Sequence, residues 1–165
     1  MSFSLIAAVS IYIASQTVQQ GYEQLPPSYI CIEAETGKII TESNADLQRP
    51  PASMLKMMVM LLADEGVHEG KWSYDTPITT SKAAQSMGGT QIYLAAGDVF
   101  PLEDMLMAMA VLSANDASVA VAESLWGSVP ACLDAMNRRA AELGMKNTHF
   151  TSVHGLPPAD RETFD

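Results

Sequence analysis

The sequence predicts an α/β fold of the α+β type, in which an N-terminal β-hairpin is followed by a cluster of helices. Residues with high β-propensity surround a single turn in segment 29–43, and long apolar segments of helical character follow from Pro51 onward. Hydrophobic residues make up 48% of the 165 residues, enough for one compact domain or for a large part of a bigger one.

The charge balance argues against a nucleic-acid partner. The chain has 9 basic and 19 acidic side chains, a net charge of -10, and no run rich in lysine and arginine. A phosphate backbone is bound mainly through clustered positive charge. We therefore expect no binding of nucleic acid.

The cysteines and histidines indicate neither a metal centre nor a disulfide-rich scaffold. Cys31 and Cys132 stand about 100 residues apart without a CxxC spacing, and His68, His149 and His154 are scattered. We expect no metal and no cofactor. The spacing leaves open whether the two cysteines pair.

The first 20 residues contain the apolar run MSFSLIAAVSIYIASQ. The run is shorter than the roughly 20 apolar residues that span a bilayer and is typical of a signal-peptide core, with small residues at Ala14 and Ser15 for cleavage. No Lys or Arg precedes it. We expect an export signal in residues 1–20 and hence an extracytoplasmic protein; a buried or interfacial N-terminal helix is the alternative.

A β-hairpin is predicted after the linker over residues 21–28. In YICIEAETGKIITES, Tyr29–Glu33 alternates and is rich in β-formers, Thr36-Gly37 supplies a turn, and Ile39-Ile40 resumes the β pattern. Helical signals dominate the rest of the chain. We therefore expect no comparable strand pair further along.

The first helix is predicted to begin near Pro51, because proline is favoured at the first helical position and restricts the residue before it. The segment Met54–Ala63 is almost entirely apolar, which places the helix inside the domain. Lys56 is the exception. It lies three residues after Ser53, so the two side chains share one face of the helix.

A lysine in this position suits nucleophilic catalysis. Apolar surroundings and the positive end of a helix dipole disfavour the charged amine, so Lys56 can accept the proton of the Ser53 hydroxyl. The Ser53 backbone N–H at the helix start can donate to an oxyanion. The alternative is a polar first-turn serine and a lysine that extends to the surface, and S-x-x-K alone favours it because the tetrad is frequent by chance.

A second polar group is predicted between two further helices, over Pro101–Leu112 and Asp116–Trp126. The break between them contains Ser113 and Asn115. In a structural interpretation, Ser113 ends one helix and Asn115 caps the next. In a functional one, Ser113 relays a proton between Lys56 and a leaving group, and Asn115 hydrogen-bonds a substrate amide. One role does not exclude the other.

The order Ser-x-x-Lys, then Ser-x-Asn, is that of penicillin-binding proteins and serine β-lactamases. From Tyr29 onward the chain resembles the low-molecular-mass D-alanyl-D-alanine carboxypeptidases, peptidase family S11. The resemblance rests on the collinear segments EAETGKII, PASMLKMM, GTQIYLAAGD, MAVLSANDASVAVAE and AMNRRAAELGMKNTHFTSVHGL.

This resemblance implies a β-lactamase/penicillin-binding-protein-like serine acyltransferase fold. It implies Ser53 as the acyl-enzyme nucleophile, Lys56 as its general base, Ser113 as the proton relay and Asn115 as a substrate contact. The implied substrate is a peptidoglycan stem peptide ending in D-Ala-D-Ala, and β-lactam antibiotics would acylate the same serine. The implied location is the periplasm or cell surface, in association with the inner membrane.

The chain departs from the family pattern at its third motif. Lys-Thr-Gly normally follows Ser-x-Asn by on the order of a hundred residues, but the sequence ends at Asp165, and Thr36-Gly37-Lys38 has the reversed order. We interpret residues 21–165 as an incomplete penicillin-binding catalytic domain that has reduced or no activity alone. The missing C-terminal half of the same domain would then be a further partner. We expect an unpaired hairpin edge and one uncovered face of the Met-rich helical core.

Two other functions stay open at this point. A class A β-lactamase usually has Ser-Asp-Asn and a deacylating glutamate in a Glu-x-x-Leu-Asn loop; this chain has Ser-Ala-Asn, and Glu142 in ELGMKN does not fit. A non-catalytic binder of peptidoglycan or β-lactams would keep the two motifs without a complete cleft.

The last predicted helix, Pro130–Leu143, is interpreted as structural. Cys132, Met136, Ala140 and Leu143 have helical spacing, which is typical of a core face, and Gly144 is a natural helix stop. His154-Gly155 is expected in a loop, without a catalytic role.

Overall fold

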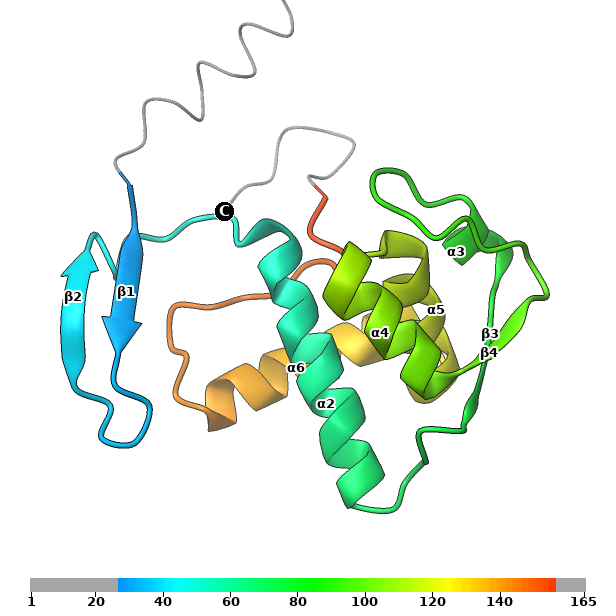
Figure 1. Cartoon of the computed structure of the whole chain (residues 1–165), viewed down its shortest axis with the longest axis horizontal. Coiled ribbons are helices and arrows are strands. Elements are labelled where there is room, and N and C mark those ends of the chain that lie inside the picture. Colours follow the sequence, from blue (N-terminus) through cyan, green and yellow to red (C-terminus); the bar gives the residue numbers. More distant parts are fainter. Residues whose placement is uncertain (1–26, 157–165) are drawn as a thin grey trace, which may run out of the picture. The chain divides into compact units, whose positions relative to one another are not determined.

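The computed structural model describes residues 27–156, and the chain divides into two compact units, residues 1–49 and 50–165 (Figure 1). The predicted export signal in residues 1–20 lies outside the described residues and stays a prediction. Between residues 27 and 156, no helix combines the length and apolar character needed to cross a membrane.

The described part of the first unit is the predicted β-hairpin. β1 (Tyr29–Ile32) pairs antiparallel with β2 (Ile39–Ser43). Gly37 has a φ of 70°, which glycine adopts readily, and its N–H donates to the Glu33 carbonyl in the turn. Nearly all side chains of both strands are exposed, and within the described residues β1 and β2 pair only with each other. The expected unpaired edge is therefore present in this part of the chain.

Helices dominate the second unit. Its elements are η1 (Ala52–Leu55), α2 (Lys56–His68), β3 (Pro77–Thr79), α3 (Lys82–Gln85), β4 (Val99–Pro101), α4 (Leu102–Leu112), α5 (Asn115–Trp126) and α6 (Val129–Glu142). α5 packs against α2, α3, α4 and α6 (Figure 1). The segment from Asn115 to Ala122 is buried throughout. The three helices predicted after Pro101 are confirmed to within one residue at each end.

The helix predicted from Pro51 differs in two ways from the expectation. It opens with the 3-10 turn η1, and α-helical geometry begins only at Lys56. It is also not buried all round, because one apolar stripe has no cover among the described residues. The exposed side chains of this stripe are Met54, Met57 and Leu61. Their spacing places them on one side of the helix and agrees with the expected uncovered face.

A second strand pair contradicts the expectation that none follows the hairpin. β3 and β4 pair antiparallel, with Ile78 opposite Phe100. Each strand has three residues and a proline at one end, so neither is long enough to show an alternating pattern. Ile78 is fully buried, and β3 packs against α5. Tertiary packing, rather than a local pattern, therefore determines this pair.

The α6 core face is confirmed for Cys132, Met136 and Ala140, which are buried, whereas Leu143 is 47% exposed. Leu143 is wrong as a core residue because the helix already ends at Glu142 and the chain turns at Gly144, whose φ is 75°. Both cysteines are free thiols, and Cys132 is buried while Cys31 is exposed.

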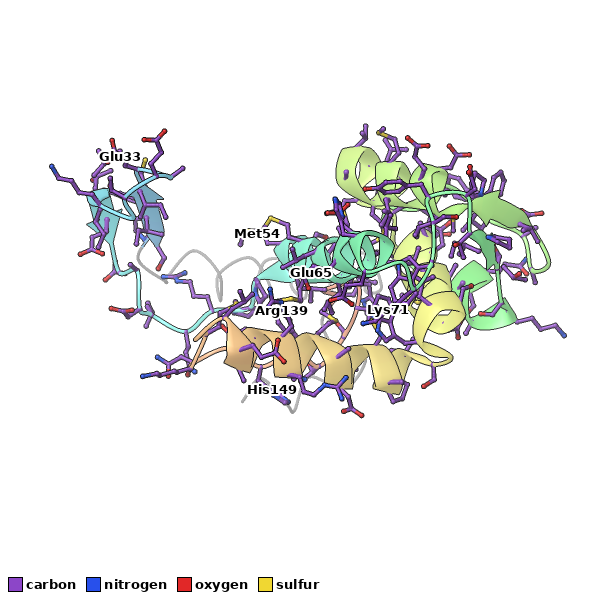
Figure 2. All side chains as sticks on the ribbon, turned by 90° about the horizontal axis from the view of Figure 1, so that it is seen from below. Glu33, Met54, Glu65, Lys71, Arg139 and His149 are labelled. Carbon is purple, nitrogen blue, oxygen red and sulfur yellow. The ribbon has the colours of Figure 1, made fainter. Side chains whose placement is uncertain are left out.

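An ion pair joins α2 to α6. Arg139 donates from Nη2 to Glu65 Oε1 at 2.6 Å and from Nε to both carboxylate oxygens at 3.1 Å. Figure 2 shows the two labelled side chains pointing toward each other between the helices. This fork geometry fixes direction as well as distance, so the pair orients α2 relative to α6.

Two methionines of α4 provide a matched test of this core. Met105 is fully buried, whereas Met107 is 58% exposed on the same helix. We expect Met105→Ala to lower the free energy of unfolding by about 2–4 kcal/mol because it leaves a cavity. Met107→Ala should lower it by less than about 0.5 kcal/mol. Urea unfolding followed by circular dichroism measures both, and equal losses would contradict the assigned core face.

Candidate active site

The amine of Lys56 lies at the centre of a cluster of oxygen atoms. Lys56 is only 1% exposed, and its Nζ donates to Ser53 Oγ at 3.1 Å, to Ser113 Oγ at 3.3 Å and to the His154 carbonyl at 2.8 Å. An ammonium group has three N–H donors, so each donor has an acceptor here. A buried lysine is tolerated only with such partners.

Ser53 lies in the 3-10 turn directly before Lys56. Side chains at i and i+3 eclipse each other in this geometry, which brings the two residues together. The preceding Ala52 has a φ of 48°, a conformation that is costly for a residue with a Cβ. The backbone is therefore strained next to an exposed serine.

Ser113 and Asn115 lie in the connection between α4 and α5. Ser113 is the C-cap of α4 with a φ of 58°, and its hydroxyl reaches Lys56. Asn115 is the first residue of α5, while the N-cap is Ala114, which makes no side-chain cap. The predicted capping role of Asn115 is wrong, because its Nδ2 donates instead to the Gly88 carbonyl at 2.8 Å.

Hydrogen bonds connect residues 88–94 to the start of α5. The Asn115 N–H donates to the Thr90 carbonyl at 2.8 Å, and the buried Asp116 carboxylate accepts two backbone N–H groups of the same segment. Asn115 Oδ1 is buried and has no hydrogen-bond partner among the described residues. Leaving such an oxygen unpaired is costly, so a donor on a ligand would gain by reaching it.

The segment 152–156 completes the cluster. The sequence predicts His154-Gly155 in a loop without a catalytic role, and the loop position is confirmed. The His154 carbonyl accepts from Lys56, and Gly155 has a φ of 80°. A Cβ at Gly155 would lie 2.2 Å from the Ala52 carbonyl oxygen, so only glycine lets this segment reach the Ser53 turn. No sequence pattern marks a backbone carbonyl as a ligand.

Burial sets the electrostatics of the cluster. It lowers the pKa of Lys56 below its ordinary value of 10.5, because desolvation disfavours the ammonium form. Burial and the positive charge of Lys56 together lower the pKa of His154. A lysine with a lowered pKa, hydrogen-bonded to a serine hydroxyl, is the arrangement that a general base and its nucleophile require.

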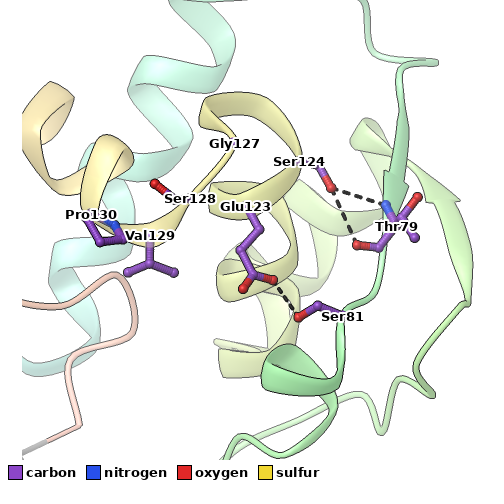
Figure 3. A pocket seen from close by; sticks show the side chains of 8 residues that line it. All are labelled: Thr79, Ser81, Glu123, Ser124, Gly127, Ser128, Val129 and Pro130. Atoms are coloured by element: carbon purple, nitrogen blue, oxygen red, sulfur yellow. Dashed lines mark hydrogen bonds between the residues drawn. The ribbon is translucent and has the colours of Figure 1, made fainter.

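A separate groove of roughly 410 Å³ lies beside β3 and the α5–α6 junction (Figure 3). Its polar groups satisfy one another: Ser81 Oγ donates to Glu123 Oε2 at 2.6 Å, and the Thr79 N–H donates to Ser124 Oγ at 3.2 Å. None of the residues around Lys56 lines it. The Lys56 cluster is the stronger candidate because it combines a lysine whose pKa is lowered by burial, a serine next to the strained Ala52, and an Asn115 oxygen without a partner among the described residues.

The fold is that of the penicillin-binding proteins, which share the β-lactamase-like architecture. The crystal structure of the D-alanyl-D-alanine carboxypeptidase DacD from Francisella tularensis matches with a TM-score of 0.78 at 37% identity, covering 81% of this chain and 32% of that one. Penicillin-binding protein 5 from Haemophilus influenzae matches with a TM-score of 0.75 at 31% identity, covering 80% and 41%.

The family model of D-alanyl-D-alanine carboxypeptidases, peptidase S11, matches residues 15–163. DacF from Bacillus subtilis (strain 168) is 43% identical over 129 residues, which are 78% of this chain and 33% of the relative. DacA from Escherichia coli (strain K12) is 36% identical over 135 residues, 78% and 34%. The chain belongs to the D-alanyl-D-alanine carboxypeptidase family, as the motifs predicted. It spans about a third of the length of these two relatives.

Two glycines allow the cost of a positive φ to be measured separately from the cost of a close backbone contact. Gly155 and Gly144 both have a positive φ, 80° and 75°, but a Cβ at Gly144 would meet nothing within 4 Å. Both alanine substitutions carry the strain of positive φ, on the order of 1 kcal/mol. We expect Gly155→Ala to cost about 1–3 kcal/mol more in unfolding free energy, because its Cβ meets backbone atoms. Equal losses in urea unfolding would contradict the close contact.

Proposed function

We propose that this chain carries the acylating centre of a serine-type D-alanyl-D-alanine carboxypeptidase that acts on peptidoglycan stem peptides ending in D-Ala-D-Ala. The observation that carries the proposal is the buried Lys56 amine in hydrogen-bond contact with Ser53 Oγ and Ser113 Oγ. Family membership supports the choice of reaction.

Acylation begins with a proton transfer. The neutral Lys56 amine accepts the Ser53 hydroxyl proton while Oγ attacks the carbonyl carbon of the penultimate D-alanine. The resulting oxyanion accepts a hydrogen bond from the Ser53 backbone N–H. The C–N bond then breaks, and the proton held by Lys56 passes through Ser113 Oγ to the departing amine. D-Alanine leaves, and Ser53 holds the rest of the peptide as an ester.

Deacylation reverses the proton path. A water oxygen attacks the ester carbon and gives its proton to Lys56; the bond from Ser53 Oγ to carbon breaks, and Oγ takes the proton back. One water is consumed for each peptide bond cleaved. Asn115 orients the substrate by accepting an amide N–H at Oδ1, which supplies the partner this buried oxygen lacks within the described residues.

The proposed substrate also determines the proposed location. Peptidoglycan lies outside the cytoplasmic membrane, and residues 1–20 have the composition of an export signal. We therefore place the protein in the periplasm or at the cell surface. Association with the inner membrane is proposed on the family resemblance alone.

A β-lactam tests the function directly. After incubation with benzylpenicillin, we expect the intact mass to rise by one penicillin, because the ring amide presents a carbonyl to Ser53 and the leaving amine stays tethered. Ser53→Ala should give no adduct. Ser86→Ala, at an exposed serine of the same unit, should react like the parent chain. If the parent chain forms no adduct, acylation by this chain is contradicted, and the alternative of a non-catalytic binder is favoured.

The role of Lys56 predicts a pH dependence. The reactive form is the neutral amine, so the acylation rate should rise with pH and level off below 10.5, since burial lowers the pKa of Lys56. Lys56→Arg keeps the charge but stays protonated, and we expect an acylation rate lower by at least about 100-fold. Lys71→Arg, at an exposed position, is the control. An unchanged rate in Lys56→Arg would exclude Lys56 as the base.

A further inference from the structure

Two side-chain hydrogen bonds close the turn over residues 152–156. The Leu156 N–H donates to His154 Nδ1 at 3.1 Å, and the Gly155 N–H donates to Ser152 Oγ at 3.0 Å. A ring nitrogen accepts only when it carries no proton, so this contact requires a neutral imidazole with its proton on Nε2. Both bonds fix the peptide units that follow the His154 carbonyl, the group that accepts from Lys56.

That carbonyl determines where the lone pair of a neutral Lys56 points. A neutral amine has two N–H donors and one lone pair. The His154 oxygen can only accept, so it takes one N–H. The second N–H goes to Ser113 Oγ, and the lone pair is left for the Ser53 hydroxyl. A base is effective when a third group orients it in this manner.

We propose that the His154 imidazole is a positioning residue for acylation: by accepting the Leu156 N–H it holds the 152–156 turn, so that the His154 carbonyl orients the Lys56 amine, and protonation of the ring releases this orientation. The proposal deepens the carboxypeptidase function and rests on it. The ring itself touches no reacting atom.

The surroundings of the turn make the effect of protonation separable from simple charge repulsion. Among the described residues, Lys56 of α2 is the charged group that acts on the ring, while η1 brings backbone atoms of Ala52 and Ser53 to Gly155, and Gly89 lies against Leu156. An imidazolium would repel the ammonium and increase the neutral fraction of Lys56. Repulsion alone would therefore raise the acylation rate at acid pH, whereas loss of orientation lowers it.

The first experiment measures acylation by benzylpenicillin in His154→Ala and His154→Asn. We expect His154→Ala to lower the acylation rate constant about 10- to 100-fold at about pH 7.5. Asparagine accepts the N–H two residues on, so His154→Asn should recover the parent rate to within about threefold. Its rate should also lack the extra fall at acid pH that protonation of His154 causes in the parent.

The matched control is His149→Asn, at an exposed histidine, which should keep the parent rate and pH profile. Three results would overturn the positioning role. They are a parent-like rate in His154→Ala, a rate in His154→Asn as low as in His154→Ala, and identical acid limbs in the parent and His154→Asn.

The second experiment does not depend on acylation. In an NMR titration of the chain, the Leu156 amide and the Lys56 Cε resonances should shift with one common midpoint as His154 protonates. Neither should shift there in His154→Asn, and both should already be displaced at about pH 7.5 in His154→Ala. If the parent chain forms no penicillin adduct, the proposed function is contradicted, but the NMR titration still tests the positioning proposal. If the Lys56 Cε resonance does not shift as His154 protonates, the positioning proposal is contradicted.

Discussion

One requirement shapes the helical unit: the buried Lys56 amine needs a hydrogen-bond acceptor for each of its donors. A buried ammonium costs several kcal/mol unless its donors are paired. Its three acceptors come from the η1 turn, the α4–α5 connection and the turn over residues 152–156. Pairing one amine therefore draws together three segments that are far apart in the chain. Two of the three oxygens are serine hydroxyls, so the same requirement brings together Ser53 and Ser113, the residues proposed as nucleophile and proton relay.

The backbone around this amine is held in conformations that residues with side chains rarely adopt. Ala52 and Ser113 have positive φ, and Gly155 packs against the Ala52 carbonyl. Such strain persists only where neighbouring contacts over-determine it. Here those contacts are the packing of the buried start of α5 and the hydrogen bonds from residues 88–94 to the Asp116 carboxylate. The buried start of α5 thus supports the strained backbone of the candidate site beside it.

Local patterns predicted the local structure well. The turn at Thr36-Gly37 and the long apolar helices could be predicted, because a hairpin turn and a helical period depend only on residues that are close together in the sequence. The pairing of β3 with β4 was not, since three-residue strands carry no period. The exposed stripe on α2 shows the same limit: composition indicates that a face is apolar, and only the arrangement of other elements decides whether it is covered.

The sequence by itself determined which residue types the candidate site contains: a serine and a lysine one turn apart, then a second serine and an asparagine at a helix break. Both spacings are short, so helix geometry alone relates the residues within each pair. Tertiary structure decided how the pairs meet and which group orients the lysine. That group is the His154 carbonyl, and every residue carries a carbonyl. Its role therefore depends on a position in space that no residue type encodes.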